Sequence, residues 1–393
     1  MKNYRSFRSN SMGFDKAKKI FMLLPVLIML LAQGGCISGP TLPPTPVESP
    51  VKYEETIFRT GVAWLAGKPS YTHFVVSPDM AKILFRKAIP NAEIARLGGL
   101  YVFDVKTRQT RQIPETPGYS WYPYSWSRDG SQIAIISYPL HEDPLRPDVY
   151  QYVDEAEILL LDSQTWEARK LAVAPAASDI PFFSQDGKKI YYFKGKKRRQ
   201  GKTPASQFDI YVYDLSSNEE SRLTNERAYM MGSGYDDGDE ILFSAAVLKG
   251  QRLFSPDPTS INKMESKKNN PMPQTAIHAL NKRSLEFHLL NIDQRILTPI
   301  DGVDDEEFFF GLSLQGKDAR KNIYFTASRS LHRYYRRFLY RCNAQGNNCS
   351  LLREIRNDGE KVRIDFNTGT LFRADVLDGE IVFRRLVELP SMQ

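Results

Sequence analysis

Histidine is the side chain that most often moves protons or binds metals near neutral pH, and here it is rare and dispersed. The chain has five histidines: His73, His141, His278, His288 and His332. None is close enough in sequence to another histidine or to a cysteine to form a metal-binding pair. We therefore predict that the histidines are structural or surface residues, and that the chain uses no metal and no cofactor.

Two groups of carboxylates are dense enough to suggest a calcium site. Residues 236–240 read Asp-Asp-Gly-Asp-Glu, and residues 301–307 read Asp-Gly-Val-Asp-Asp-Glu-Glu. Neither group has the ligand spacing of an EF-hand loop, so we interpret both as solvated turns. No catalytic residue is predicted anywhere in the chain.

Two further segments carry side chains that suit a partner or a ligand. Residues 194–202 form a basic loop that could contact anionic lipid or an acidic partner, and a solvated hairpin tip is the alternative. Residues 118–126 are rich in aromatic rings that could stack on a sugar or a peptide, and packing between repeats is the alternative. The candidate contact residues are Lys196, Lys197, Arg198, Arg199, Trp121, Tyr122 and Trp126.

Residues 1–35 predict a signal peptide. A basic segment precedes an apolar run of 13 residues, 20–32. A helix of that length spans about 20 Å, short of the roughly 30 Å of a bilayer core, so we do not expect a transmembrane helix. The formal charge of +7 falls to +2 when residues 1–35 are removed, so no nucleic-acid partner is expected.

Cys36 follows Gln33-Gly34-Gly35, an arrangement that resembles a bacterial lipobox except that Gln33 stands where leucine is typical. The resemblance implies that Cys36 is lipidated; cleavage by an ordinary signal peptidase is the alternative. Residues 36–50 are proline-rich and predict a semi-rigid tether. Acyl chains on Cys36 would hold the protein on a membrane. Ile37 favours the outer membrane, with the domain facing the periplasm.

The remaining two cysteines, Cys342 and Cys349, flank a polar turn between two predicted strands. Cysteines on opposite strands of a hairpin can approach closely enough for a disulfide, and an exported protein lies where disulfides persist. We predict that they are bonded; two free thiols in a loop is the alternative.

A short signature recurs along the chain: an apolar strand, a Ser-x-Asp-Gly turn and a second apolar strand. The turn aspartates of the first four copies, Asp79, Asp129, Asp186 and Asp237, are 50, 57 and 51 residues apart. A degraded fifth copy spans 311–327. Aspartate and glycine favour tight turns, so turn formation explains these aspartates without catalysis. A second strand pair follows each copy and begins near residues 100, 158, 210, 287 and 338.

Four strands in each unit of about 50 residues predict an all-β chain with a single β-propeller over residues 51–393. We predict six four-stranded blades, with an insert at 249–283. The last unit, 360–389, shows three strands, and residues 51–61 would supply the fourth. A β-sandwich is the alternative, but it does not explain one turn recurring at one place in every unit.

The repeat resembles that of the TolB family of periplasmic proteins. The resemblance is clearest in residues 74–136 and 181–243, and residues 210–224 are the most similar stretch. TolB carries an additional N-terminal α/β domain and is soluble, whereas this chain has a predicted tether. Membership in the Tol system therefore does not follow, and no partner-binding residue is carried over. The repeat also resembles the propeller of prolyl oligopeptidases, but residues 311–316 do not match a Gly-x-Ser-x-Gly nucleophile motif.

These features predict a non-enzymatic, membrane-anchored envelope lipoprotein whose propeller is a protein-binding scaffold with an envelope protein as its partner. One alternative is a module that captures sugars or peptides. The other is a glycan lyase or hydrolase with its site in the central channel.

Overall fold

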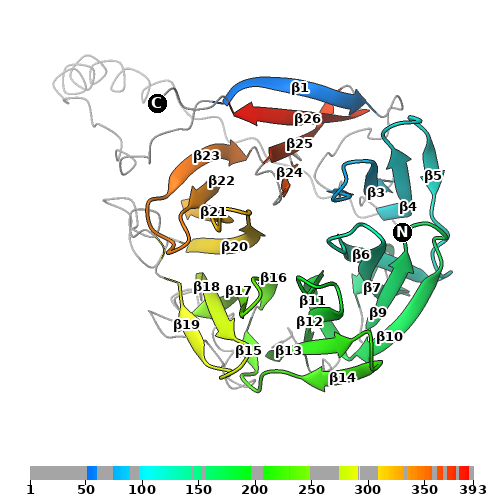
Figure 1. Ribbon diagram of the computed structural model, residues 1–393. Helices are drawn as coiled ribbons and strands as arrows, with labels where there is room; N and C mark the ends of the chain where they lie inside the picture. Colours follow the sequence, from blue (N-terminus) through cyan, green and yellow to red (C-terminus); the bar gives the residue numbers. More distant parts are fainter. Residues whose placement is uncertain are drawn as a thin grey trace, which may run out of the picture. The chain divides into compact units, whose positions relative to one another are not determined.

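A computed structural model describes residues 51–59, 74–88, 97–143, 146–152, 156–195, 207–229, 231–247, 274–290, 292, 309–331, 334–355, 361–365, 370–377 and 380–388. The described part is all-β, with 26 strands and no helix (Figure 1). It follows that none of its elements is an apolar helix able to cross a membrane. The chain divides into two compact units, 1–43 with 300–302 and 44–299 with 303–393, and every described residue belongs to the second.

The strands form antiparallel sheets that follow one another along the chain (Figure 1). The first contains β2 (Phe74–Val76), β3 (Lys82–Ala88), β4 (Leu97–Asp104) and β5 (Thr110–Gln112). The second contains β6 (Tyr119–Trp126), β7 (Gln132–Asp143), β8 (Arg146–Tyr152), β9 (Ala156–Asp162) and β10 (Ala168–Ala174). The third contains β11 (Ala176–Phe183), β12 (Lys189–Gly195), β13 (Gln207–Asp214), β14 (Glu219–Arg222) and β15 (Ala228–Tyr229).

An eight-stranded sheet comes next, made of two antiparallel sets. One set is β16 (Gly232–Asp236), β17 (Glu240–Val247), β18 (Gln274–Asn281) and β19 (Phe287–Leu289). The other is β20 (Phe309–Lys317), β21 (Ile323–Leu331), β22 (Tyr334–Cys342) and β23 (Ser350–Ile355). Only one parallel pair, Thr275 with Gly311, joins the sets. The number of blades, six with four strands each, stays a prediction.

The last sheet combines both ends of the described chain. It contains β24 (Lys361–Asp365), β25 (Thr370–Leu377), β26 (Glu380–Glu388) and β1 (Val51–Arg59). β1 pairs antiparallel with β26 along its whole length. The N-terminal segment therefore completes the C-terminal sheet, so that both ends of the chain share one sheet, as the sequence predicts.

Apolar clusters lie between successive sheets, because alternate side chains of each strand point to the two opposite faces of its sheet, and each face packs against the next sheet. One cluster unites the first and second sheets around Leu100 and Trp121, and others continue between each following pair. The final cluster packs Phe383 of β26 against Phe74 of β2, with ring centroids 4.7 Å apart. The sheets thus close into a ring, which buries the faces that each sheet would expose alone.

The Ser-x-Asp-Gly signature forms the turn between the first two strands of a sheet. In the third sheet Ser184 donates to Asp186 Oδ1 (2.6 Å), and its Oγ accepts from the Lys189 amide (2.9 Å). Gly187 follows with a φ of +71°, which few other residues tolerate. The Ser77 and Ser127 turns have the same hydrogen bonds. Asp186 is therefore a turn former, as the sequence predicts.

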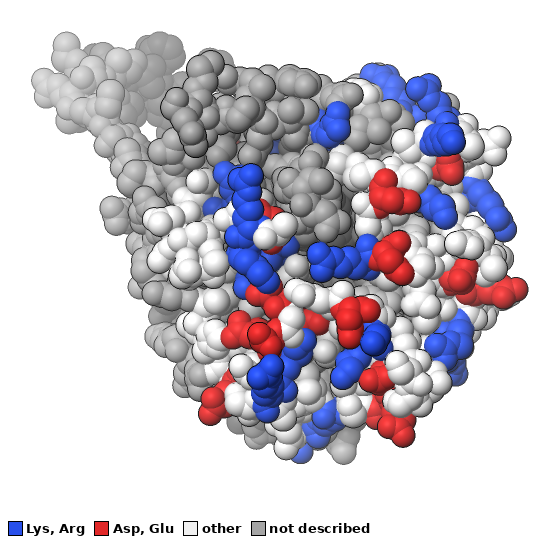
Figure 2. All heavy atoms as spheres, viewed as in Figure 1, with Lys and Arg blue, Asp and Glu red and all other residues white. Residues whose placement is uncertain are grey.

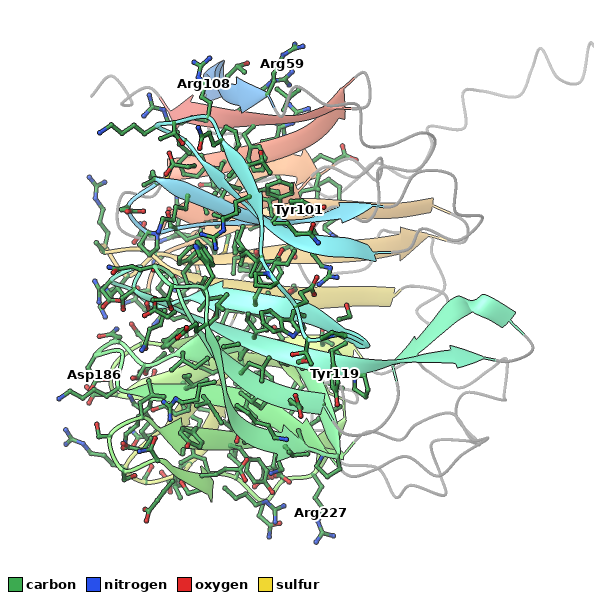
Figure 3. The ribbon with its side chains drawn as sticks, turned by 90° about the vertical axis from the view of Figure 1, so that its right-hand side faces the viewer. Arg59, Tyr101, Arg108, Tyr119, Asp186 and Arg227 are labelled. Carbon is green, nitrogen blue, oxygen red and sulfur yellow. A yellow bond between two sulfur atoms is a disulfide. The ribbon has the colours of Figure 1, made fainter. Side chains whose placement is uncertain are left out.

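These turns and those between the third and fourth strands lie on one side of the ring, which we call the turn face. Figure 3 shows it at the left, with Asp186 and Arg108 on two of its turns. A two-stranded ribbon formed by the ends of β7 and β8 extends from the opposite side (Figure 3).

The insert is predicted to span residues 249–283, and its C-terminal boundary is wrong. Residues 274–281 form β18, which pairs with β17 in unbroken register from Glu240↔Asn281 to Val247↔Gln274. The strand near residue 287, predicted to open the second strand pair, is consequently the fourth strand, β19. The rest of the insert lies outside the described residues.

Candidate functional site

The turn face holds a cluster of ion pairs at the ends of β16 and β20 and in the turns beside them. We call it the inner cluster, and it consists of Asp236, Asp237, Lys282, Lys317 and Lys321. Asp237 accepts from Lys317 Nζ at 2.5 Å and from Lys321 Nζ at 2.8 Å, and Asp236 accepts from Lys282 Nζ at 2.8 Å. The two Asp237 pairs reach across the boundary between β16–β19 and β20–β23 and hold these two sets together, whereas the Asp236–Lys282 pair lies within β16–β19.

Asp236 is the most buried carboxylate of the inner cluster, with a side chain only 2% exposed. It also accepts from the amides of Gln185 (3.0 Å) and Gly238 (3.1 Å). Gln185 belongs to the turn between β11 and β12, so the cluster links the third sheet to β16–β19 and to β20–β23. A buried carboxylate needs such a full set of donors, because burial without them would be costly.

The local environment determines the protonation of Asp237 in the inner cluster and of the neighbouring Tyr235. Burial alone would raise the pKa of Asp237, but the hydrogen bonds from Lys317 and Lys321 outweigh it and hold the pKa below its usual range. Burial, and secondarily the charge of Asp237, raises the pKa of Tyr235 to about 12. Tyr235 donates its hydroxyl hydrogen to the Lys317 carbonyl (3.1 Å). At neutral pH the carboxylate stays charged and the phenol stays neutral.

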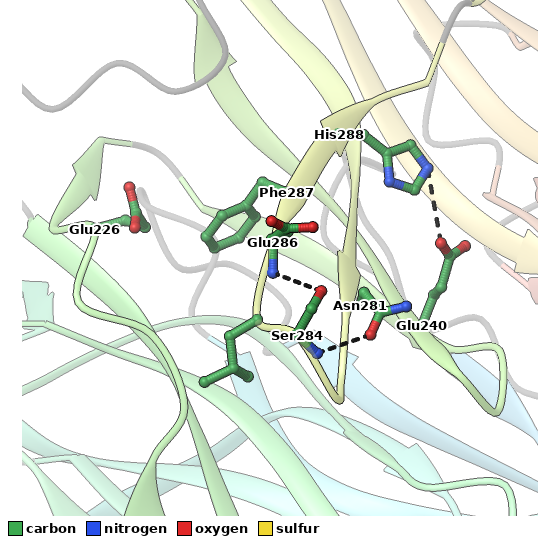
Figure 4. A pocket seen from close by; sticks show the side chains of 8 residues that line it. Glu226, Glu240, Asn281, Ser284, Glu286, Phe287 and His288 are labelled. Atoms are coloured by element: carbon green, nitrogen blue, oxygen red, sulfur yellow. Dashed lines mark hydrogen bonds and ion pairs between the residues drawn. The ribbon is translucent and has the colours of Figure 1, made fainter.

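An open groove lies at the outer edge of the same strand set, at the hairpin between β18 and β19 (Figure 4). Its volume is about 680 Å³, and we call it the outer groove. It is lined by Glu226, Glu240, Asn281, Ser284, Leu285, Glu286, Phe287 and His288. Figure 4 shows Glu226 and Phe287 on one side of the hairpin, and His288 and Glu240 on the other. The groove therefore wraps around an edge strand.

The carboxylates of the outer groove have few partners, in contrast to those of the inner cluster. The Glu226 and Glu286 side chains form no ion pair or hydrogen bond with any residue in the described ranges. Glu240 has only His288, whose Nε2 lies 3.7 Å away. No lysine or arginine lines the groove among the described residues. The groove is therefore a negatively charged site that this part of the chain does not neutralise.

The outer groove also exposes apolar surface. Among the described residues only three large apolar side chains are strongly exposed: Val173, Leu285 and Leu289. Leu285 is 46% exposed and Leu289 is 40% exposed, and both flank Phe287. Phe287 itself packs against the core ring of Phe243. Of these residues, Phe287 and Leu285 line the groove, and Leu289 is a further exposed leucine two positions beyond Phe287.

Leu285 is not among the contact residues predicted from the sequence, although a repeated turn pattern identifies its position. Asn281 Oδ1 accepts from the Arg283 and Ser284 amides, as Asp162 Oδ1 does from two amides of its own turn. Four residues after the capping side chain the backbone has positive φ in each of these turns. The residues at that position are Arg108, Trp166, Asn218 and Leu285. Aligning Asn281 with Asp104, Asp162 and Asp214 would have located both β18 and Leu285.

The structure corrects the prediction that Trp121 contacts a ligand. Trp121 is 2% exposed and packs in the cluster between the first two sheets, and its carbonyl accepts from Arg86 Nη1 (2.8 Å). Trp126 is partly buried against the same cluster. Packing between repeats, the alternative interpretation, describes both rings. Tyr122 lies on β6, and its side chain is outside the described part.

The other predicted residues divide between described and undescribed regions. Cys342 and Cys349 form a disulfide with a Cα–Cα distance of 4.0 Å, inside the core cluster shared by the two sets of the eight-stranded sheet. His278 is buried and stacks on Phe243, with ring centroids 5.6 Å apart. Outside the described residues lie Cys36, Lys196, Lys197, Arg198, Arg199 and the acidic segment 301–307. No group of three potential metal ligands occurs among the residues that the structure describes.

Comparison with known proteins gives no match to a family model and none to a curated protein sequence. Solved structures similar to this chain include TolB propeller proteins. TolB from Acinetobacter baumannii is 15% identical with a TM-score of 0.45, and the match covers 81% of this chain. The match spans 63% of that TolB chain, which is less than two thirds of its length.

Two further similar structures are a putative TolB and a lyase. A putative TolB from Agrobacterium tumefaciens is 16% identical over 81% of this chain and 90% of its own, with a TM-score of 0.46. Oligogalacturonate lyase from Vibrio parahaemolyticus is 11% identical over 86% of this chain and 94% of its own, with a TM-score of 0.44. The sheet topology of the described residues is that of a β-propeller, an architecture that occurs in proteins with and without enzymatic activity.

Proposed function

We propose that this protein is a non-enzymatic envelope lipoprotein whose propeller binds a partner protein through the turn face. The observation that carries the proposal is the charge pattern of that face. Figure 2 shows acidic and basic side chains interspersed over its described part. A surface of both signs complements another protein surface better than it complements a uniformly anionic polymer.

The chemistry of the inner cluster supports binding over proton transfer. A general acid that works near neutral pH needs a raised pKa, and hydrogen bonds from two lysines hold the pKa of Asp237 below its usual range. Its charges neutralise one another across a boundary between strand sets. Such a cluster provides a rigid platform for the surrounding surface.

The proposed location follows from the N-terminal segment. Lipid on Cys36 would anchor the protein, and the proline-rich residues 36–50 would hold the propeller away from the membrane. We place it on the outer membrane, facing the periplasm. A partner that reaches the turn face would then be another envelope protein.

Crosslinking in intact cells, followed by purification of the protein, tests this proposal. The matched control is Cys36→Ala, which removes the acylated thiol and leaves the propeller unchanged. We expect one protein to be recovered reproducibly with the wild type and to be reduced with the variant. If wild-type and variant chains recover no specific protein, the scaffold proposal is wrong.

The size of the outer groove favours a second candidate, capture of a sugar or a peptide. Its volume of about 680 Å³ falls within the range of small-ligand sites. Incubating the purified chain with an envelope glycan extract tests this candidate. Depletion of one component, unchanged in mass, would indicate capture; its conversion to shorter products would indicate a glycan lyase or hydrolase.

A further inference from the structure

We infer that the outer groove is a docking site for an extended basic segment of a partner protein, with an apolar side chain placed among cationic ones. This inference rests on the proposed function in one respect, because it takes the partner to be a protein. It adds a second surface, the outer edge of β18–β19, and it specifies the chemistry of what binds there.

The charge of the groove selects a cationic occupant. Glu226, Glu240 and Glu286 bring three carboxylates to one site, and among the described residues that line it only His288 offers a counter-charge. Lysine or arginine side chains of a partner would supply the missing positive charges, and complementary charge also speeds encounter. Elsewhere on this strand set the chain supplies its own lysines, as at Asp236 and Asp237.

The exposed leucines select an apolar side chain between those cations. Trp166 occupies the same turn position as Leu285 two sheets earlier along the chain and also has a positive φ. It is only 7% exposed because it packs between sheets. Leu285 has no such cover and is 46% exposed. Covering Leu285 and Leu289 with a partner's apolar group would remove this surface from water.

The backbone at the groove suits an extended segment. β19 pairs on one side with β18, and no described strand pairs with its outer edge. An extended peptide can add to such an edge by main-chain hydrogen bonds, with alternate side chains pointing to the two sides. Because the groove wraps around this edge, a single peptide would meet Glu226 and Phe287 on one side and Glu240 and His288 on the other.

The walls of the groove are already organised. β18 pairs with β17 over eight consecutive residues, and Asn281 fixes the turn by accepting two backbone hydrogen bonds, of 2.9 and 3.0 Å. A preformed site loses less entropy on binding than a flexible loop does. We therefore expect a short peptide to bind without a large change in the protein.

Fluorescence anisotropy tests this inference with the processed chain as purified from cells. The probe is a short fluorescein-labelled peptide of alternating lysine and leucine, and the reference probe has glutamate in place of lysine. We expect saturable binding of the basic probe that weakens as NaCl rises, and at least tenfold weaker binding of the acidic probe.

Three variants locate the binding site. Glu226→Gln combined with Glu286→Gln should raise the Kd of the basic probe about fivefold or more. Leu285→Asn should raise it by a similar factor, and asparagine tolerates the positive φ of this position. Glu167→Gln combined with Glu219→Gln makes the same change of charge at exposed positions on other strand sets and should leave the Kd unchanged.

Each outcome separates this inference from the proposed function. Equal binding of both probes, or equal weakening by the groove and control variants, would overturn the docking site. So would a dimer that forms at high concentration and is lost in the groove variants, because the occupant would then be a second copy. A partner recovered from cells without peptide binding would leave the scaffold standing and reject the groove. Peptide binding without a cellular partner would leave the groove as a binding site and reject the scaffold proposal.

Discussion

The inner cluster and the outer groove both include residues of β16–β19, yet their carboxylates have opposite environments. In the inner cluster each aspartate is paired with at least one lysine of this chain, and the Asp237 pairs join β16–β19 to β20–β23. In the outer groove, the side chains of Glu226 and Glu286 have no partner among the described residues, and Leu285 remains exposed. The difference separates charge that stabilises the fold from charge that remains for a partner. We expect substitutions in the first region to change stability and substitutions in the second to change binding.

The largest expected effect comes from Lys317→Met, which removes one partner from a pair that is about nine-tenths buried. The Lys317 side chain is 8% exposed and that of Asp237 is 11% exposed. Losing one member of a buried pair should lower the free energy of unfolding by about 3 kcal/mol. Urea denaturation measures this change. Lys321→Met is the control: its side chain is 55% exposed, so a loss of less than about 1 kcal/mol is expected. Equal effects would mean that burial does not decide the strength of these pairs.

The disulfide lies in the core between the two strand sets that the inner cluster joins, and its removal should have the next largest effect. Cys342 and Cys349 are seven positions apart. Closing so short a loop restricts the unfolded chain by about 2.5 kcal/mol. Cys342→Ala with Cys349→Ala should therefore lower the urea midpoint while leaving peptide binding at the groove intact. Loss of peptide binding in a folded double variant would contradict the separation of the two regions.

The pH dependence of stability should distinguish the inner cluster by a somewhat smaller effect. The pKa of Asp237 is lower in the folded chain than in the unfolded chain, so its contribution is complete above the unfolded value of 3.8 and is lost as pH falls through the folded value. Asp237→Asn should cost about 2 kcal/mol at pH 7. The gap between wild type and variant should narrow below about pH 4. Urea titrations from pH 7 to pH 3 measure it, and a gap that widens in acid would refute the assignment.

The smallest expected effect is at Leu285, where the groove and the turn geometry meet. Leu285 has a φ of +57° and is largely exposed, so Leu285→Asn removes little packing and relieves backbone strain. We expect thermal unfolding to show a gain of about 0.5 kcal/mol while the basic peptide binds more weakly. A loss of more than 1 kcal/mol would show that Leu285 is a structural residue.

Much of the fold was predictable because the turns repeat. The bonds that Ser184 makes are local, so the residue types of the turn determine them. The pairing of β1 with β26 followed from a unit that lacked one strand. β18 was missed because asparagine replaces the usual aspartate at Asn281, and because the Ser-x-Asp-Gly turn is altered in this strand set. There Asp237 N donates to the Glu240 carbonyl, a shorter turn than that of Ser184.

The candidate site was less predictable, for a physical reason. Lys317 and Asp237 are 80 residues apart, and their pairing depends on how two strand sets pack. The acidic segment 236–240 was interpreted as a solvated turn, yet Asp236 is buried and fully bonded. Trp121 was considered a ligand contact because aromatic rings serve both stacking and packing, and only its burial distinguishes the two. Exposure and pairing, which separate the two regions, are properties of the assembled ring.

Site-specific photo-crosslinking in living cells tests the central claim most directly. A photoreactive side chain at Leu285 would report on the groove, and one at Val173 of β10, which is 42% exposed, is the matched control on another strand set. The account predicts a discrete crosslinked protein from position 285 that is absent from position 173 and is lost when Glu226→Gln and Glu286→Gln are added. The same product from both positions, or none from position 285 in a folded and exported chain, would contradict a partner site at the groove.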